Sequence, residues 1–328
     1  MLESGRSAAD THTSRVRTNR CRHRHVRKNT TYLVTKKCAD GAFLLVPNPR
    51  LNQALLYLLA LKAGQYGILV HAYCFLSNHF HLVVTDVDGT LPVFMREFLG
   101  ETSKAVQVIS KLDRAIWARK RYSAVELLDL DATERKIAYT ILNPTRADLT
   151  EPGDWPGATS ASTKFGDHIV VDRPNQYFSN RRPEQVRLAL EPAVAKLHFR
   201  SNTSDEHERQ RATMESNARI DQLVAAGRDE SASARERAKK GLLGAARVLH
   251  TARDHRCPRP IRRRNPRFAS RCAALLAAAV ERYQQFENDH SRAKERYLAG
   301  DLDVLFPEGT YGYRMLFGVR SVVSGSAA

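Results

Sequence analysis

The amino-acid sequence predicts an α+β fold, with a small antiparallel sheet, helices on one face of it, and a mostly helical basic region after it. Three observations predict this class. Short β-rich runs alternate with amphipathic helical runs in the first half of the chain, two of the β-rich runs are joined by only two residues, and periodicity is lost near residue 160. Strands joined by so short a turn pair antiparallel, and mixed strand and helix runs of this kind are typical of α+β domains.

The first elements follow from local composition and spacing. Residues 31–35 are β-branched, aromatic or aliphatic and predict a strand, and residues 52–64 carry leucines at helical spacing before a glycine that ends the helix. Residues 68–76 are almost entirely apolar and predict a buried strand. A further strand over 79–85 follows after two residues, so these last two strands are antiparallel neighbours.

Two more helices and a strand are expected after this pair. Apolar residues recur at helical spacing over 90–111, with Thr90 as the N-cap, and residues 122–128 predict another strand. An aspartate with a glutamate three positions later opens a helix over 131–143, and Pro144 ends it. This order of elements fits a small antiparallel sheet with helices packed on one face.

Changes in composition divide the chain into four regions. Residues 1–26 are polar and basic, which predicts a flexible tail, and residues 27–160 hold the elements of the sheet. Prolines and weak periodicity over 161–200 predict a connecting region. Residues 201–328 are mostly helical and basic, and they include a dense run of arginines.

The charge of the chain points to a polyanionic partner. The 328 residues include 52 Lys and Arg against 35 Asp and Glu, a net charge of +17. Such an excess favours nucleic acid as the partner, with an acidic membrane surface second.

The remaining composition excludes several other classes. No apolar run approaches the roughly 18 residues of a membrane helix, and the basic N-terminus lacks the apolar stretch of a secretory signal. The five cysteines are scattered and form no CxxC pair, which argues against a disulfide framework and a thiolate zinc site. We therefore expect a protein of the reducing cytoplasm.

The most informative motif is His79-Phe80-His81, at the start of a predicted strand. Strand side chains alternate between faces, so the two imidazoles lie on one face, about 7 Å apart at Cα, and Phe80 points into the core. Histidine is the commonest metal ligand, and such a pair can share one ion. The alternative is a pair of half-buried polar residues at a strand edge. A second instance, His23-Arg-His25, lies in the basic tail, where we interpret it as accidental.

A tyrosine on a later helix is a candidate nucleophile. Tyr139 and Asn143 are four residues apart and share a helical face, which can present a phenol and an amide oxygen to the histidines. A phenol is a poor nucleophile near neutral pH, because its pKa is about 10. A nearby cation polarises a phosphodiester and stabilises the phenolate-like charge of the attack. The alternative for Tyr139 is a half-buried helix residue with one hydrogen bond.

Two motifs carry a resemblance to a known family. The run AYCFLSNHFHLVV over 72–84 resembles the HUH segment of single-strand transposases, in which two histidines flank a hydrophobic residue. The run YTILNPTRA over 139–147, followed by Asp154-Trp-Pro156, resembles the tyrosine helix of the REP-associated tyrosine transposases. These are bacterial relatives of the small single-tyrosine insertion-sequence transposases. The resemblance covers residues 27–160 and departs at Ser77, where family members commonly have a proline.

The resemblance implies a ferredoxin-like or RRM-like fold and a metal-dependent transposase that is also a single-strand DNA endonuclease. His79 and His81 would bind Mg²⁺ or Mn²⁺, Asn143 would be a third ligand, and Tyr139 would be the nucleophile. The tyrosine would become joined to the 5′ phosphate of single-stranded or hairpin DNA, and the released 3′ hydroxyl could later reverse the step. Two imidazoles are not the ligands that Mg²⁺ prefers, so phosphate oxygens and water must complete the coordination. The resemblance also implies a bacterial protein of the cytoplasm and nucleoid, and it favours a monomer over a dimer.

Two basic clusters are candidates for DNA binding. The first lies between Trp117 and Tyr122, where the resembling family has a tryptophan and a basic-aromatic cluster, and the second lies in the arginine run beside Phe268. Arginines there would neutralise phosphates, and an adjacent aromatic ring can support stacking. The candidate residues are Arg119, Lys120, Arg121, Arg262, Arg263 and Arg264.

Two other functions remain consistent with the sequence. A domesticated relative that binds DNA hairpins without strand transfer would have the same basic tail and arginine run. A metal-dependent hydrolase would use His79 and His81 to activate water. Its nearest carboxylates are Asp86 and Asp88, and neither has the spacing of a convincing general base.

Overall fold

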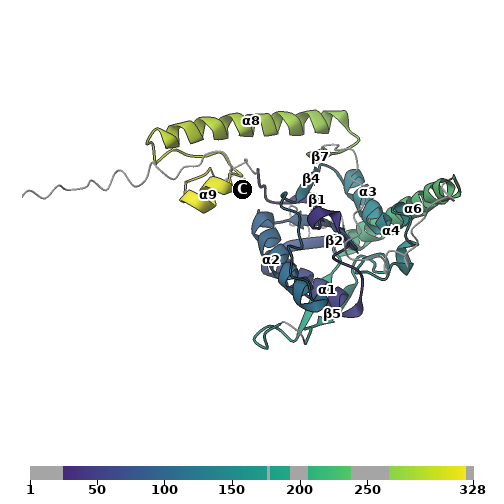
Figure 1. The fold of residues 1–328 in the computed structure, drawn as a ribbon. Helices are drawn as coiled ribbons and strands as arrows, with labels where there is room; N and C mark the ends of the chain where they lie inside the picture. The colour runs from purple at the N-terminus through teal and green to yellow at the C-terminus, as the bar shows by residue number, and fades with distance from the viewer. Residues whose placement is uncertain (1–24, 176–177, 193–205, 238–265, 323–328) are drawn as a thin grey trace, which may run out of the picture. The chain divides into compact units, whose positions relative to one another are not determined.

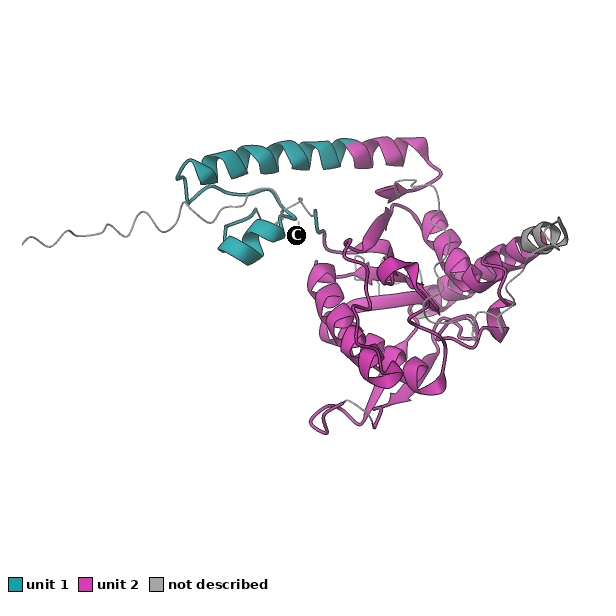
Figure 2. Cartoon of the chain, viewed as in Figure 1, with its two compact units in different colours: residues 1–26, 281–328 teal, residues 27–280 magenta. Residues whose placement is uncertain are grey.

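The computed structural model describes most of the chain, namely residues 25–175, 178–192, 206–237 and 266–322 (Figure 1). The chain divides into two compact units, one of residues 27–280 and one of residues 1–26 with 281–328 (Figure 2). The larger unit contains the sheet and all of the candidate site residues that the structure describes.

The larger unit is built on a five-stranded sheet in the order β2-β3-β1-β4-β7. The first four strands pair antiparallel, and β7 pairs parallel to β4. This confirms the α+β class, and the two strands predicted on either side of the two-residue turn match β2 and β3 to within one residue. The strands are β1 (Thr30–Lys37), β2 (Ile68–Leu76), β3 (His79–Asp86), β4 (Ser123–Leu127) and β7 (Phe268–Ala269).

Two helices form a layer on one face of this sheet (Figure 1). Helix α1 spans Pro49–Gln65, helix α2 spans Leu91–Ser110, and the two pack against each other. The core lies between them and the sheet: Phe80 of β3 is fully buried, with its ring centroid 5.9 Å from that of Phe98 and 5.4 Å from that of Trp117. The order β1-α1-β2-β3-α2-β4 is that of ferredoxin-like domains.

A third helix lies against the opposite face. Helix α3 (Leu130–Ile141) contacts β2, β3 and β4, and the single turn α4 (Asn143–Arg146) follows it. Tyr139 of α3 faces His81, whose side chain leaves β3 on the side opposite to Phe80 because neighbouring strand residues alternate. The layer of α1 and α2 is as predicted, whereas α3, which the prediction placed on the same face, covers the opposite face of the sheet.

The segment interpreted as a connecting region contains regular structure. Strands β5 (His168–Asp172) and β6 (Gln185–Ala189) form an antiparallel hairpin that contacts α1. The long helix α6 (Glu206–Arg237) then packs on α3. Two short 3-10 helices, Ala39–Gly41 and Pro152–Asp154, lie in the connections.

The start of α2 differs from the prediction in its cap. Thr90 occupies the N-cap position, but its hydroxyl donates to the carbonyl of Tyr66 at 2.6 Å. The carboxylate of Asp86, at the end of β3, instead accepts the backbone N–H groups of Thr90 and Leu91, each at 2.8 Å. A carboxylate is the stronger acceptor at a helix N-terminus, because it also interacts with the helix dipole.

The observed bounds of α3 also differ from the predicted helix over 131–143. Its N-cap is Asp129, whose side chain accepts an N–H group of the first turn, and Asp131 lies inside the helix. The helix ends at Ile141, and Asn143 begins α4 where the prediction had it near the end of α3. The residue before a proline disfavours the helical conformation, which explains an interruption here.

The smaller unit has a hydrophobic cluster of its own. Helix α8 (Ala273–Leu298) begins in the larger unit and continues into the smaller, and α9 (Gly312–Phe317) follows. Phe306 and Tyr313 are buried and stacked, with ring centroids 5.2 Å apart. The ring of His25 stacks on Phe286 at 4.2 Å, so this histidine of the tail motif packs against an aromatic side chain. Across the described part of the chain, no helix is long and apolar enough to cross a membrane.

Candidate active site

The two histidines of the HUH-like motif share one face of β3. His79 pairs in register with Lys37 of β1, and His81 pairs with Thr35. The imidazole ring centroids are 4.9 Å apart and the ring planes are nearly perpendicular, at 85°. The strand therefore places two ring nitrogen donors side by side, as its two-residue alternation requires.

Each imidazole is oriented by a hydrogen bond at its Nδ1 atom. His79 Nδ1 donates to the Oδ1 atom of Asn78 at 2.6 Å, since that oxygen can only accept. His81 Nδ1 is 2.9 Å from the Oγ1 atom of Thr35. In metal sites, a ligating histidine commonly uses its second ring nitrogen in this way, which fixes the ring and leaves Nε2 for the metal.

Both histidines are neutral at neutral pH. Burial is the main cause that lowers the pKa of His79 to about 4, and the charge of Lys37 adds to it, while a hydrogen bond with the Asn143 side chain acts in the opposite direction. Burial first, and then the electrostatic interactions with the neighbouring His79 and with Lys37, also hold the pKa of His81 well below its usual value. The neutral imidazole is the form that binds a metal ion.

Helices α3 and α4 bring the phenol and the amide to this pair. The ring centroid of Tyr139 is 5.4 Å from that of His81, and the two planes are nearly perpendicular at 87°. Asn143 is buried, and its side chain is close enough to His79 to act on the pKa of that imidazole. The structure thus assembles the four residues that the sequence singled out from β3, α3 and α4, and their catalytic roles stay predictions.

The donor set at this site fits a divalent metal ion with mixed ligands. His79 and His81 offer two imidazole nitrogens and Asn143 offers an amide oxygen, a combination that suits Mn²⁺ better than Mg²⁺. Within the described residues, no cluster of three or more His, Cys, Asp or Glu could hold a metal. Any ion bound here therefore needs Asn143, substrate oxygens or water to complete its coordination.

The first predicted basic cluster lies on a segment fixed by a buried lysine. Lys36 donates from Nζ to the carbonyl oxygens of Ala118 at 2.7 Å and Lys120 at 2.6 Å. Arg119, Lys120 and Arg121 are exposed, so their charges face solvent. The second cluster, Arg262, Arg263 and Arg264, lies outside the described residues.

Trp155, which follows the family-like run over 139–147, packs against the sheet. It is buried against Cys74 and Leu76, and its indole N–H donates to the carbonyl of Phe75 at 2.9 Å. Since Cys74 pairs in register with His81, this cluster packs on the histidine face of the sheet. Trp155 therefore fixes the segment after α4 against the same face as the candidate site.

Neither carboxylate considered for a hydrolase lies beside the histidines, because Asp86 and Asp88 are at and beyond the opposite end of β3. Asp86 is at the far end of β3 from His79, is fully buried, and binds the N-terminus of α2 with both oxygens. A general base needs a free carboxylate within hydrogen-bonding reach of its water. The engagement of Asp86 as a helix cap removes it as that base.

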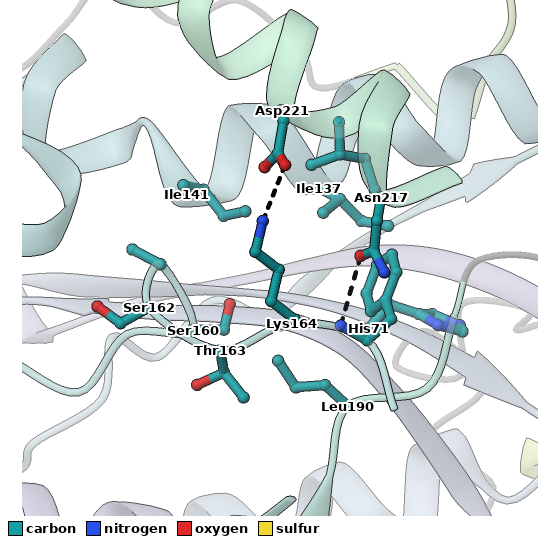
Figure 3. A pocket seen from close by; sticks show the side chains of 13 residues that line it. His71, Ile137, Ile141, Ser160, Ser162, Thr163, Lys164, Leu190, Asn217 and Asp221 are labelled. Carbon is teal, nitrogen blue, oxygen red and sulfur yellow. Dashed lines mark hydrogen bonds and ion pairs between the residues drawn. The ribbon is translucent and has the colours of Figure 1, made fainter. Parts of the chain in front are cut away.

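A separate pocket lies on the other side of α3 (Figure 3). It has a volume of about 150 Å³, and Ile137 and Ile141 of α3 form part of its wall. Both are two residues from Tyr139, so they leave the helix on the side away from it. Two of its lining residues form an ion pair, with Lys164 Nζ 2.8 Å from the carboxylate of Asp221. This pocket therefore does not form part of the histidine site.

Sequence reasoning missed five side chains that surround the site. Thr35 and Lys37 could be found only from the pairing register of β1 with β3, which joins segments far apart in the chain. Lys136 carried a usable signal, because it lies three residues before Tyr139 and so shares its helical face. The five side chains are Thr35, Lys37, Asn78, Lys136 and Arg146.

Comparisons with known proteins give a limited result. No family model and no curated protein matches the sequence. One solved structure that aligns with the chain is a REP-associated tyrosine transposase bound to a REP hairpin, with 19% sequence identity and a TM-score of 0.36. The alignment covers 43% of this chain and 81% of that one. A likeness at this TM-score assigns neither a family nor an activity.

Proposed function

We propose that this protein is a metal-dependent DNA strand-transfer enzyme, and more narrowly a single-tyrosine transposase-like endonuclease acting on single-stranded or hairpin DNA. The observation that carries the proposal is the placement of Tyr139, whose ring centroid is 5.4 Å from that of His81 and which comes from a different element of the fold. The resemblance of the runs 72–84 and 139–147 to the motifs of REP-associated tyrosine transposases supports the choice of substrate.

The reaction is a transesterification. The phenolic oxygen of Tyr139 attacks the phosphorus of a phosphodiester, and the bond from phosphorus to the 3′ oxygen breaks. The phenol loses its proton to solvent, and the departing oxygen takes up a proton to become a 3′ hydroxyl. A 5′-phosphotyrosine bond replaces the phosphodiester, so the step conserves a phosphate ester and can run in reverse.

The histidine pair and the amide have positioning roles in this scheme. His79 and His81 would hold a divalent cation through Nε2, with their rings fixed by Asn78 and Thr35. When bound, the cation supplies Lewis-acid polarisation of the phosphodiester. Asn143, on the turn after Tyr139, links the position of the tyrosine helix to that of His79.

Formation of a covalent protein–DNA adduct tests this function. The full chain is incubated with single-stranded and hairpin oligonucleotides and Mn²⁺, and a denaturing gel is examined for a shifted protein band. We expect the band with the wild-type chain and with the control Tyr66→Phe, and its loss in Tyr139→Phe and His79→Ala. The control tyrosine lies at the end of α1, away from the histidines.

The other outcomes distinguish the alternative functions. An adduct that forms normally in Tyr139→Phe would overturn the assignment of the nucleophile. Gel shifts of hairpins without any cleavage would favour a DNA-binding protein that lacks strand transfer. Cleavage without an adduct would favour hydrolysis by an activated water.

A further inference from the structure

Three cationic side chains face the candidate site, and among the residues that the structure describes none of them forms an ion pair with a carboxylate. We propose that Lys37, Lys136 and Arg146 form an anion site that binds one phosphodiester group between the histidine pair and Tyr139. The assignment of this group to DNA rests on the function proposed above, whereas the anion site itself rests on the placement and charge of these three residues.

Lys37 stands on the histidine side of the site. It is the register partner of His79 in the antiparallel pair of β1 and β3, so the two side chains leave the sheet on the same face. Its side chain is exposed to solvent. Lys37 can therefore reach an anion that approaches the histidine pair from solvent.

Lys136 and Arg146 stand on the tyrosine side. The Nζ atom of Lys136 lies 5.2 Å from the ring centroid of Tyr139, and the guanidinium carbon of Arg146 lies 5.5 Å from it. Lys136 is half-buried and Arg146 is exposed.

No carboxylate neutralises these three charges in the part of the chain that the structure describes. The two acids of α3 are engaged elsewhere: Asp131 binds Arg135 at 2.8 Å, and Glu134 binds Arg219 at 2.8 Å. The cations near Tyr139 therefore lack the local acids that could have paired with them.

This arrangement is unfavourable without an anion. Burial first, and then the charge of Arg146, lower the pKa of Lys136, which means that the fold disfavours its charged form. A contact with an aromatic ring attracts a cation but does not neutralise it. Like charges held together without a counter-ion are typical of functional sites, where a bound ligand supplies the missing charge.

A phosphodiester fits this requirement in charge and in place. It carries one negative charge, spread over two non-bridging oxygens, and these accept hydrogen bonds from ammonium and guanidinium groups. An anion held by Lys136 and Arg146 lies beside the phenol of Tyr139. In the transition state of the attack the charge on these oxygens grows, so the same two cations stabilise it further.

The first test measures DNA binding without reaction. In a Tyr139→Phe background, affinity for a single-stranded oligonucleotide is measured as a function of salt for Lys37→Met, Lys136→Met and Arg146→Met. Loss of the one phosphate contact flattens the plot of log K against log salt by about 0.7, so each of the three variants should flatten it by up to that amount. The control substitutions Lys104→Met and Arg50→Met remove exposed cations of α2 and α1, away from the histidine face, and we expect an unchanged slope.

The second test separates ligand binding from a merely structural role. If Lys136 served the fold through its contact with Tyr139, Lys136→Met would lower the Tm of the free protein. The anion site predicts the reverse, a higher Tm, because an uncompensated charge is removed. It also predicts that Lys136→Arg and Arg146→Lys, which keep the charge, retain most of the binding, and a loss of binding in both would overturn it.

The outcomes keep this inference distinct from the proposed function. If the wild-type chain forms no adduct but the three variants still flatten the salt slope, the anion site stands and the strand-transfer function fails. If the adduct forms and the three variants leave both slope and adduct yield unchanged, the strand-transfer function stands and the anion site fails.

Discussion

The two faces of the central sheet carry side chains with different roles: one face is an apolar core, and the other holds the candidate site. On the face that α1 and α2 cover, Phe80 meets Phe98 and Trp117 in a closely packed apolar core. On the face that α3 covers, His79 and His81 lie beside Tyr139. Consecutive residues of one strand thus serve stability and chemistry separately, and substitutions on the two faces are expected to have separable effects.

The largest effect on stability is expected on the apolar face. Phe80→Ala removes a fully buried ring, and such a change costs about 3–5 kcal/mol in the free energy of unfolding. His81→Ala, one residue away, removes a ring from the site and is expected to abolish adduct formation at a much smaller cost in stability. Urea denaturation of both variants checks this, and equal destabilisation would contradict the separation of the two faces.

A smaller effect is expected where α6 supports the site face. Gly227 of α6 lies so close to Leu142, between α3 and α4, that a Cβ atom at this position would overlap the leucine side chain. We expect Gly227→Ala to destabilise the protein by about 1–3 kcal/mol, the range for overpacking a buried contact. Adding Leu142→Ala makes room for the new methyl group, so the second substitution should cost less in the Gly227→Ala chain than in the wild type.

Gly227→Ala is also expected to lower the yield of the covalent adduct. Leu142 immediately precedes Asn143, so a shift of this turn changes the contact of Asn143 with His79. We expect adduct formation to fall in Gly227→Ala at temperatures where the protein is fully folded. A folded variant with unchanged adduct yield would show that α6 does not position the site.

The smallest effect is expected at an ion pair on the apolar side. Glu101 of α2 binds Lys62 at 2.7 Å and Arg182 through a shorter contact of 2.5 Å. Burial opposes ionisation of Glu101, but the hydrogen bonds from Arg182 and Lys62 outweigh it and lower its pKa. Glu101→Gln should cost about 1 kcal/mol at neutral pH, since pairs of this kind are partly exposed.

The pH dependence of that effect has a definite sign. Because the folded state lowers the pKa of Glu101, its stabilisation is fully present above the unfolded pKa of about 4.3. It is lost as the pH falls through the lower, folded value. The stabilities of wild type and Glu101→Gln, measured by urea denaturation, should therefore converge in acid, and a difference that grows with falling pH would refute the assignment.

The sequence was sufficient for the features that depend on neighbouring residues. Strands β2 and β3, the turn between them and the common face of His79 and His81 follow from alternation and from a two-residue connection. The approach of Tyr139 to His81 was inferred from the family-like motifs and is observed in the structure.

Contacts between segments that are far apart in the sequence could not be predicted from local sequence patterns. The pairing of Lys37 with His79 depends on the register of two strands separated by a helix and a strand. The packing of α6 on α3 depends on a fit between Gly227 and Leu142 that no periodicity reveals. The capping of α2 by Asp86 was missed for a related reason. The acceptor belongs to the preceding strand, four residues before the residue expected to be the N-cap.

The most direct test of the central claim is to identify the residue that carries DNA after reaction. The adduct formed with a single-stranded oligonucleotide and Mn²⁺ is digested with protease and nuclease, and its peptides are sequenced by mass spectrometry. We predict a 5′-linked nucleotide on the peptide that contains Tyr139, attached through the phenolic oxygen. A nucleotide on another residue, or cleaved DNA with no modified peptide, would contradict the account.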